Sequence, residues 1–271
     1  MTPQDELIKL VVRAADELGI DIMVIGAWAR DYWVERFGLQ GNIRTTFDID
    51  FACQIAVWND FDQLRKHLRN CYGLSYDAPN PAQSKSKIHT LWLRNEVSMD
   101  IVPCGEIADE NGMIAWPPDY ENTLCVLGYD TAKEHAEAIA IGDSKVKIIK
   151  LHWLALLKLQ SYIGNPYERG KDLNDLFFIA RNYFDCIDAD TRIYAANGVD
   201  SDLLAAEDFD YWVAGAELIV RDCQRDNSAI TTKITEEIRR FDQAKLCMDF
   251  CAVNNIKSDL AKRLLSAFAK A

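Results

Sequence analysis

Two acidic residues, Asp48 and Asp50, stand one residue apart in an apolar stretch of the chain. Phe47, Ile49 and Phe51 alternate with them, which is the period-two pattern of a β-strand with one apolar face. Both carboxylates of such a strand point to the same side. Because two negative charges this close repel each other unless a cation lies between them, the pair is a candidate set of oxygen ligands for Mg²⁺. A solvated strand edge is the alternative interpretation.

A glycine turn lies upstream of this pair. The apolar run 22–25 ends at Gly26, and the chain then passes directly into a helix-like segment, 27–37. The N–H groups at a helix start are a natural seat for phosphate, and a glycine lets the backbone approach a ligand closely. The pattern therefore predicts a strand, a tight turn and a helix that together could hold a phosphorylated substrate.

A third carboxylate, Asp100, lies downstream among apolar residues in the predicted strand 97–102. A carboxylate in such surroundings is costly to bury unless it meets a partner. Three carboxylates on two strands, next to a glycine turn, predict a two-cation site for in-line phosphoryl chemistry. His89 falls on the neighbouring predicted strand, but a lone histidine is more often structural, so we do not include it in the site.

Three segments occur in a meaningful order: Gly26-Ala27, then Thr-Phe-Asp-Ile-Asp at 46–50, then Met-Asp-Ile at 99–101. This order resembles the nucleotidyltransferase superfamily that includes DNA polymerase beta and the CCA-adding enzymes. The segment 26–31, Gly-Ala-Trp-Ala-Arg-Asp, is similar to the Gly-Gly-Xaa-Val-Arg-Asp of CCA-adding and poly(A) polymerases. One departure is Ala27, which stands where that motif usually has Gly or Ser and offers a backbone donor without a hydroxyl.

A later motif makes the resemblance more specific. Lys158 is followed by Arg-Gly-Lys-Asp-Leu-Asn-Asp at 169–175. This arrangement is similar to the Lys…Arg/Lys-Asp-Xaa-Xaa-Asp motif of AbiEii-type toxins from abortive-infection and toxin–antitoxin systems. Together the motifs cover residues 20–180, somewhat over half of the chain.

The resemblance implies a reaction in which a hydroxyl attacks the α-phosphate of a nucleoside triphosphate such as ATP and pyrophosphate leaves. It implies that Asp48 and Asp50 hold two Mg²⁺ ions, for which Mn²⁺ is a substitute. Asp100 would share the second ion and take the proton of the attacking hydroxyl. These three residues are the predicted catalytic and metal-binding set.

The resemblance also implies residues that contact the nucleotide. Backbone N–H groups of Gly26 and Ala27 would face the β- and γ-phosphates, and Lys158 would reach the triphosphate as a point charge. The remaining candidates for nucleotide binding or support are Thr46, Arg44, Lys171, Arg30, Asp172 and Asp175. An ion pair on a helix surface is an equally good interpretation of the last motif.

The residue pattern predicts an α+β protein, with a small mixed β-sheet core flanked by helices and a mainly helical C-terminal region. We expect a nucleotidyltransferase domain at 1–150 and a helical domain at 151–271 that contributes to the nucleotide and acceptor cleft. Helical spacing predicts helices at 4–19, 58–72, 150–163, 167–183, 208–224, 230–252 and 257–270. We expect a hairpin turned at Asn95, a loop at 103–118 and short strands between 124 and 150.

Composition limits the environments and partners of the chain. No apolar run approaches the ~20 residues that span a bilayer, and the acidic N-terminus lacks a signal-peptide pattern, so we expect no membrane association and a cytoplasmic protein. The eight cysteines are scattered without a Cys-Xaa-Xaa-Cys pair, which indicates free thiols. A net charge of −12 argues against tight binding to duplex DNA. A local basic group could still guide an RNA end, and the candidates are Arg65, Lys66 and Arg69, or Lys85 and Lys87, or Lys145, Lys147 and Lys150. A solvated face is the alternative interpretation of each group.

Three hypotheses for function stay open from the sequence. The first is a nucleotidyltransferase that modifies an RNA 3′ end as a toxin, with an antitoxin as a candidate partner. In the second, the same chemistry modifies a small molecule or a protein hydroxyl. The third is a module that binds nucleotide without turnover, and the presence of all three carboxylates argues against it.

Overall fold

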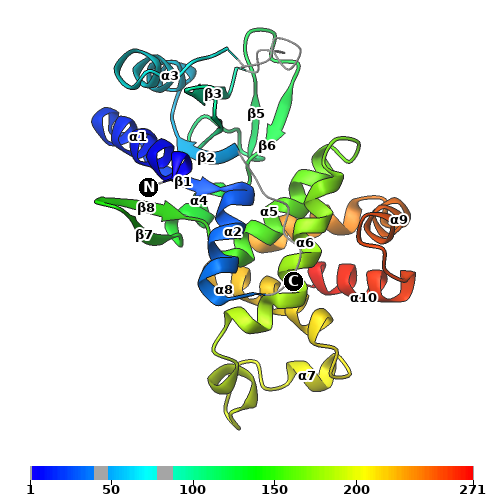
Figure 1. Ribbon diagram of the computed structural model, residues 1–271. Coiled ribbons are helices and arrows are strands. Elements are labelled where there is room, and N and C mark those ends of the chain that lie inside the picture. Colours follow the sequence, from blue (N-terminus) through cyan, green and yellow to red (C-terminus); the bar gives the residue numbers. More distant parts are fainter. Residues whose placement is uncertain (1, 40–47, 78–87, 271) are drawn as a thin grey trace. The chain divides into compact units, whose positions relative to one another are not determined.

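The computed structural model describes residues 2–39, 48–77 and 88–270 (Figure 1). The chain forms two compact units, one made of Met1–Trp33 and Gly41–Lys150 and the other of Val34–Gln40 and Leu151–Ala271. The α+β class predicted from the sequence is confirmed, with a mixed sheet followed by a helical region. In the described part of the chain, no helix has the length and apolar character needed to span a bilayer.

The first unit is built on a six-stranded mixed sheet. Its strand order is β3-β4-β2-β1-β8-β7. The strands are β1 (Ile22–Ile25), β2 (Asp48–Gln54), β3 (Thr90–Leu93), β4 (Val97–Cys104), β7 (Glu137–Ile141) and β8 (Ser144–Ile148). The central pair β2 and β4 is parallel, whereas β1 runs antiparallel to β2 and β3 runs antiparallel to β4.

Alternation along β2 and β4 gives the sheet one apolar face. Ile49, Phe51, Met99 and Ile101 are each fully buried, while the residues between them include the half-buried acidic side chains. Helix α1 (Pro3–Leu18) packs against α3 (Trp58–Tyr72) and contacts β4, and both helices contribute buried leucines to the core. Predictions for these helices and for the hairpin are confirmed, since Arg94 and Asn95 form its turn with positive φ.

Two predictions for the first unit are wrong in detail. The segment expected to be a loop contains β5 (Met113–Ala115), which pairs with β6 (Thr123–Cys125) in a separate two-stranded sheet. The segment expected to hold only short strands contains α4 (Tyr129–Glu134). Each element is six residues or shorter, so too few side chains repeat for periodicity to identify it.

The second unit is helical. Helix α2 (Gly26–Phe37) begins in the first unit and ends in the second, which otherwise contains α5 (Leu151–Gly164), α6 (Gly170–Asn182), α7 (Leu203–Ala206), α8 (Tyr211–Arg240), α9 (Gln243–Asn254) and α10 (Ser258–Phe268). The predicted helix 230–252 is wrong, because a break at 241–242 separates α8 from α9. Asp242 caps α9 by accepting hydrogen bonds from the backbone of Ala244 and Lys245.

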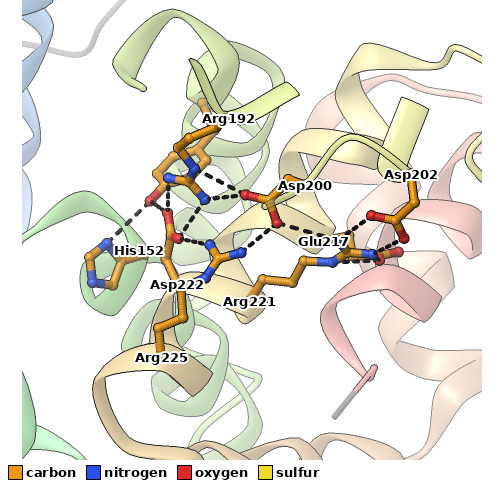
Figure 2. A network of polar contacts seen from close by, with 9 residues as sticks. His152, Arg192, Asp200, Asp202, Glu217, Arg221, Asp222 and Arg225 are labelled. Atoms are coloured by element: carbon orange, nitrogen blue, oxygen red, sulfur yellow. Dashed lines mark hydrogen bonds and ion pairs between the residues drawn. The ribbon is translucent and has the colours of Figure 1, made fainter. Parts of the chain in front are cut away.

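A network of charged side chains lies within the helical unit (Figure 2). Its centre is Asp200, whose side chain is fully buried and lies 2.7 Å from Arg192 Nη2 and 2.5 Å from Arg225 Nη2. Burial alone would raise the pKa of Asp200, but hydrogen bonds from Arg225 and Arg192 outweigh it and hold the pKa below its usual range. The labelled members are His152, Arg192, Asp200, Asp202, Glu217, Arg221, Asp222 and Arg225.

Candidate active site

Asp50 and Asp100 are neighbours across the parallel strands β2 and β4. The register pairs Asp50 with Asp100 and Asp48 with Ser98. Since paired residues of adjacent strands project to the same face and side chains alternate along each strand, Asp48, Asp50 and Asp100 all lie on one face of the sheet. Each of the three is half-buried. The predicted placement of three carboxylates on two strands therefore describes the structure.

The glycine turn lies directly against Asp50. Ile25, the last residue of β1, pairs with Asp50, and Gly26 follows with φ +72°. A Cβ atom on Gly26 would lie 1.9 Å from Asp50 Oδ2 and 2.7 Å from its Cγ. Only glycine fits this turn, because any side chain would need both the left-handed backbone and the space that the carboxylate occupies. Ala27 follows as a buried residue of α2.

The hairpin strand β3 supports the third carboxylate. The register of β3 and β4 pairs Thr90 with Asp100, and the Thr90 hydroxyl donates a hydrogen bond of 2.6 Å to Asp100 Oδ1. His89 Nε2 lies 3.9 Å from Asp100 Oδ2. Thr90 is not among the residues predicted from the sequence and His89 is left out of that set, although the predicted turn at Asn95 indicates both. In a hairpin centred on residue 95, Thr90 must face Asp100.

The donor set of the site suits a hard divalent cation. Mg²⁺ and Mn²⁺ prefer carboxylate oxygens, which Asp48, Asp50 and Asp100 supply. Within residues 2–39, 48–77 and 88–270, no three acidic, histidine or cysteine side chains are already grouped closely enough to hold a metal ion. The residue types and the shared sheet face fit such an ion.

The remaining candidates of the first unit lie in different settings. Arg30 is 3% exposed, and its Nε donates a hydrogen bond of 2.8 Å to Asp31 Oδ1. This placement gives Arg30 a carboxylate partner next to it in the sequence. Arg44 and Thr46 lie outside the described residues, so their predicted roles stay predictions.

The later motif forms a compact ion cluster between α5 and α6. Lys158 Nζ lies 2.7 Å from Asp172 Oδ1 and 2.8 Å from Asp175 Oδ2. The side chain of Lys158 is 12% exposed and that of Asp172 is fully buried. Burial lowers the pKa of Lys158, but the two carboxylates outweigh it, and the net pKa lies above its usual value. The ammonium group is therefore held charged by partners within its own unit.

Two more residues of that motif, Arg169 and Lys171, are more exposed than Lys158, Asp172 and Asp175. Arg169 Nε lies 3.0 Å from Asp172 Oδ2, but its hydrogen bond goes to Ser161 Oγ at 2.8 Å. Asp172 Oδ2 accordingly has a charged neighbour, yet no hydrogen-bond donor among the described residues. Lys171 is exposed on the surface of α6. Lys158 thus forms ion pairs between α5 and α6, and its contact with the triphosphate stays a prediction.

Comparison with known proteins decides the family. The family model of the nucleotidyl transferase AbiEii toxin, type IV TA system, matches residues 39–244, which is more than half of the chain. The chain belongs to the AbiEii nucleotidyltransferase family. The predicted resemblance and enzyme class are thereby confirmed, and the AbiEii match covers β2, β4 and the Lys158 motif. No curated protein matches the sequence.

Solved structures give weaker likenesses. One is the solution structure of the antibiotic-resistance factor ANT(2'')-Ia, with 15% identity, a TM-score of 0.36, and coverage of 65% of this chain and 81% of that one. Another is an antigenic nucleotidyltransferase-like protein from Paracoccidioides brasiliensis, with 13% identity, a TM-score of 0.38, and coverage of 85% and 91%. Both TM-scores are below 0.5, so neither structure adds weight to the assignment.

Proposed function

We propose that this AbiEii nucleotidyltransferase transfers a nucleoside monophosphate from a nucleoside triphosphate to a hydroxyl acceptor at the face that carries Asp48, Asp50 and Asp100. The observation that carries this proposal is the contact between the Gly26 backbone and the Asp50 carboxylate, beside the Asp50–Asp100 pair. A phosphate-binding turn and two paired carboxylates thus meet at one edge of the site. We propose Mg²⁺ as the metal, with Mn²⁺ as a substitute.

Asp48, Asp50 and Asp100 would hold the divalent ions. Bound divalent cations neutralise negative charge that builds up on the phosphoryl oxygens during displacement. The N-terminus of α2 is the proposed phosphate-binding site, since its first turn has no acidic residue and its N–H groups start at Gly26. Backbone donors at this position favour the β- and γ-phosphates of the substrate.

The transfer has a simple bond balance. The acceptor oxygen forms a bond to the α-phosphorus, the bond from that phosphorus to the β-bridging oxygen breaks, and pyrophosphate leaves. The hydroxyl proton passes to Asp100, whose orientation is fixed because Thr90 donates to Oδ1. Thr90 thus acts through Asp100 as a positioning residue.

We propose an RNA 3′ end as the acceptor, in the cytoplasm, where nucleoside triphosphates are available, and an antitoxin as the candidate partner of the system. Membership in a toxin family of a TA system supports the antitoxin as partner. Transfer to a small molecule or a protein hydroxyl is the second candidate, which the net charge of −12 favours because an acidic surface attracts small or basic acceptors. Nucleotide binding without turnover is the third hypothesis.

Labelling separates the three. The protein is incubated with each α-labelled nucleoside triphosphate, Mg²⁺ and either total RNA or cell lysate, and the labelled fraction is identified. Label on RNA supports the first acceptor, and label on protein or a small molecule supports the second. Binding of nucleotide without transfer to any fraction would contradict the proposed activity.

A further inference from the structure

A row of aromatic rings begins next to Asp100. The ring of His89, whose Nε2 is 3.9 Å from Asp100 Oδ2, lies 5.3 Å from the ring of Trp116. Trp116 in turn lies 5.2 Å from Trp58 at the start of α3. All three residues are half-buried, and the side chain of His89 is 30% exposed.

The row continues into two guanidinium groups. The link is the fully buried ring of Phe61, which lies 5.7 Å from Trp116 and 5.6 Å from the guanidinium of Arg65. Arg65 also lies 4.5 Å from the ring of Tyr76, and Arg69 lies 5.2 Å from the same ring. We call His89, Trp116, Trp58, Arg65, Tyr76 and Arg69 the aromatic shelf.

Arg65 is the most constrained of these cations. Its side chain is 14% exposed and its Nη1 lies 3.6 Å from Asp62 Oδ1, beyond hydrogen-bond length. The Nε atom of Arg65 is buried and has no hydrogen-bond partner among the residues that the structure describes. The two rings hold the guanidinium of Arg65 in place, so that its positive charge adds to the local potential that attracts a phosphate.

The sheet order places His89, the shelf residue next to Asp100, and the glycine turn on opposite sides of the carboxylates. In the order β3-β4-β2-β1, Asp100 and Asp50 occupy the central strands β4 and β2. Gly26 follows β1 on one side, whereas His89 precedes β3 on the other. In phosphoryl transfer the attacking and leaving oxygens are roughly in line. If pyrophosphate leaves toward Gly26, the acceptor hydroxyl must approach from the side of the shelf.

We propose that the aromatic shelf binds the single-stranded end of a nucleic-acid acceptor, with a terminal base against Trp116 and His89 and the backbone directed toward Arg65 and Arg69. The inference rests on the proposed function and deepens it. Alternating rings and cations suit unpaired bases joined by phosphates, since base stacking on aromatic faces is independent of sequence. One or two aromatic rings are enough to bind a small-molecule acceptor, whereas the shelf has four rings and two arginines.

Binding without chemistry tests the shelf. We would measure the anisotropy of a 5′-labelled eight-nucleotide RNA with a free 3′-hydroxyl, in the absence of nucleoside triphosphate and metal. Trp116→Leu keeps an apolar side chain but removes the π face, and it should weaken binding on the order of 5- to 100-fold. Trp212→Leu, at a 41% exposed tryptophan of the helical unit, is the matched control and should bind as the wild type does.

Salt dependence tests the cations. If Arg65 and Arg69 each contact one phosphate, the double variant Arg65→Ala/Arg69→Ala should reduce the slope of log Kd against log salt by about 1.4. Circular dichroism and thermal melts establish that each variant is folded. Equal RNA affinity of the wild type and Trp116→Leu, or no measurable binding by the wild type, would overturn the proposal.

Two measurements separate this inference from the proposed function. RNA with 4-thiouridine as its last nucleotide should crosslink, on irradiation, to peptides that contain His89 or Trp116. A crosslink only to the second unit would refute the shelf. Asp50→Asn should abolish transfer and still bind the oligonucleotide. If that variant transfers normally, the proposed site is wrong, whereas a dead Asp50→Asn with unchanged binding by Trp116→Leu refutes the shelf alone.

Discussion

At the scale of single residues, the hydroxyl of Thr90 fixes the carboxylate that we assign as proton acceptor. Its hydrogen bond to Asp100 Oδ1 is 2.6 Å long and links β3 to β4 through side chains as well as backbone. A hydrogen bond to a charged acceptor contributes more than one between neutral groups. We therefore expect Thr90 to affect the rate of transfer through Asp100 and not through the nucleotide.

Replacing Thr90 with valine should lower kcat by about 10- to 100-fold, because a hydrogen bond to a charged group is worth about 1.5–3 kcal/mol. KM for the nucleoside triphosphate should change little. Steady-state kinetics check both values, and Thr90→Ser, which keeps the hydroxyl, should restore most of kcat. Equal kcat for the valine and serine variants would show that the hydroxyl has no part in positioning Asp100.

Gly26 allows a second residue-scale prediction with a close control. Gly26→Ala should reduce transfer by about 100-fold, because a Cβ 1.9 Å from Asp50 Oδ2 must displace that carboxylate. Gly73 has the same φ of +72°, but a Cβ there meets no atom within 4 Å. Gly73→Ala should thus lower the free energy of unfolding by about 1–2 kcal/mol through backbone strain alone. Its rate of transfer should equal that of the wild type. Activity that falls equally in both variants would assign the loss to strain.

At the scale of elements, the ion pairs of Lys158 with Asp172 and Asp175 join α5 to α6. Stabilising this helix pair is an alternative role to binding the nucleotide. Lys158→Met leaves the buried carboxylates of Asp172 and Asp175 without their shared cation, which should cost about 3–5 kcal/mol of unfolding free energy. Urea unfolding measures this loss. Lys171→Met, at an exposed lysine of α6, should stay within about 0.5 kcal/mol of the wild type. A stable Lys158→Met with a raised nucleotide KM would instead support the role predicted from sequence.

Asp200 gives the helical unit a pH dependence with a defined sign. Its folded pKa lies below the unfolded value of about 3.9, so its stabilising contribution is present above that pH and is lost as pH falls through the folded pKa. Asp200→Asn should therefore lower the urea midpoint clearly at pH 7 and progressively less below pH ~4. Asp202→Asn, at a side chain 67% exposed, should change the midpoint little. A constant difference between Asp200→Asn and wild type across pH would contradict this linkage.

Long periodic elements were predictable from sequence, and short or interrupted ones were not. The apolar spacing of α3 gave its bounds, Trp58–Tyr72, and the alternation around Asp48 gave β2. By contrast, α8 runs through Asn227, whose φ of −157° and ψ of 97° interrupt the helix. Asn227 then caps the following turn, since its Oδ1 accepts from the backbone of Ile230. Spacing alone does not distinguish such an interruption from a helix end.

The candidate site was predictable to the extent that it follows strand alternation. Period-two patterns placed Asp48, Asp50 and Asp100 on strands, and the register of β2 with β4 then brought Asp50 beside Asp100. Side-chain partners were not predictable in this way. The two carboxylates around Lys158 depend on how α5 packs against α6, which a charge pattern within one helix does not specify.

At the scale of the whole molecule, the chain is strongly acidic. The net charge of −12 opposes general attraction to nucleic acid, so an RNA acceptor must be held by a local group. The aromatic shelf supplies such a group within the first unit, where the carboxylates and the glycine turn also lie. The expectation that residues 151–271 contribute to the nucleotide and acceptor cleft stays a prediction.

Transfer of label from an α-labelled nucleoside triphosphate by matched carboxylate variants tests the central claim most directly. With Mg²⁺ and total RNA, Asp50→Asn and Asp100→Asn should each reduce transfer on the order of 100-fold or more while remaining folded. Asp16→Asn, at an exposed acidic residue of α1, should transfer as the wild type does. Near-normal transfer by Asp50→Asn or Asp100→Asn would contradict the assignment of the active site to this face of the sheet.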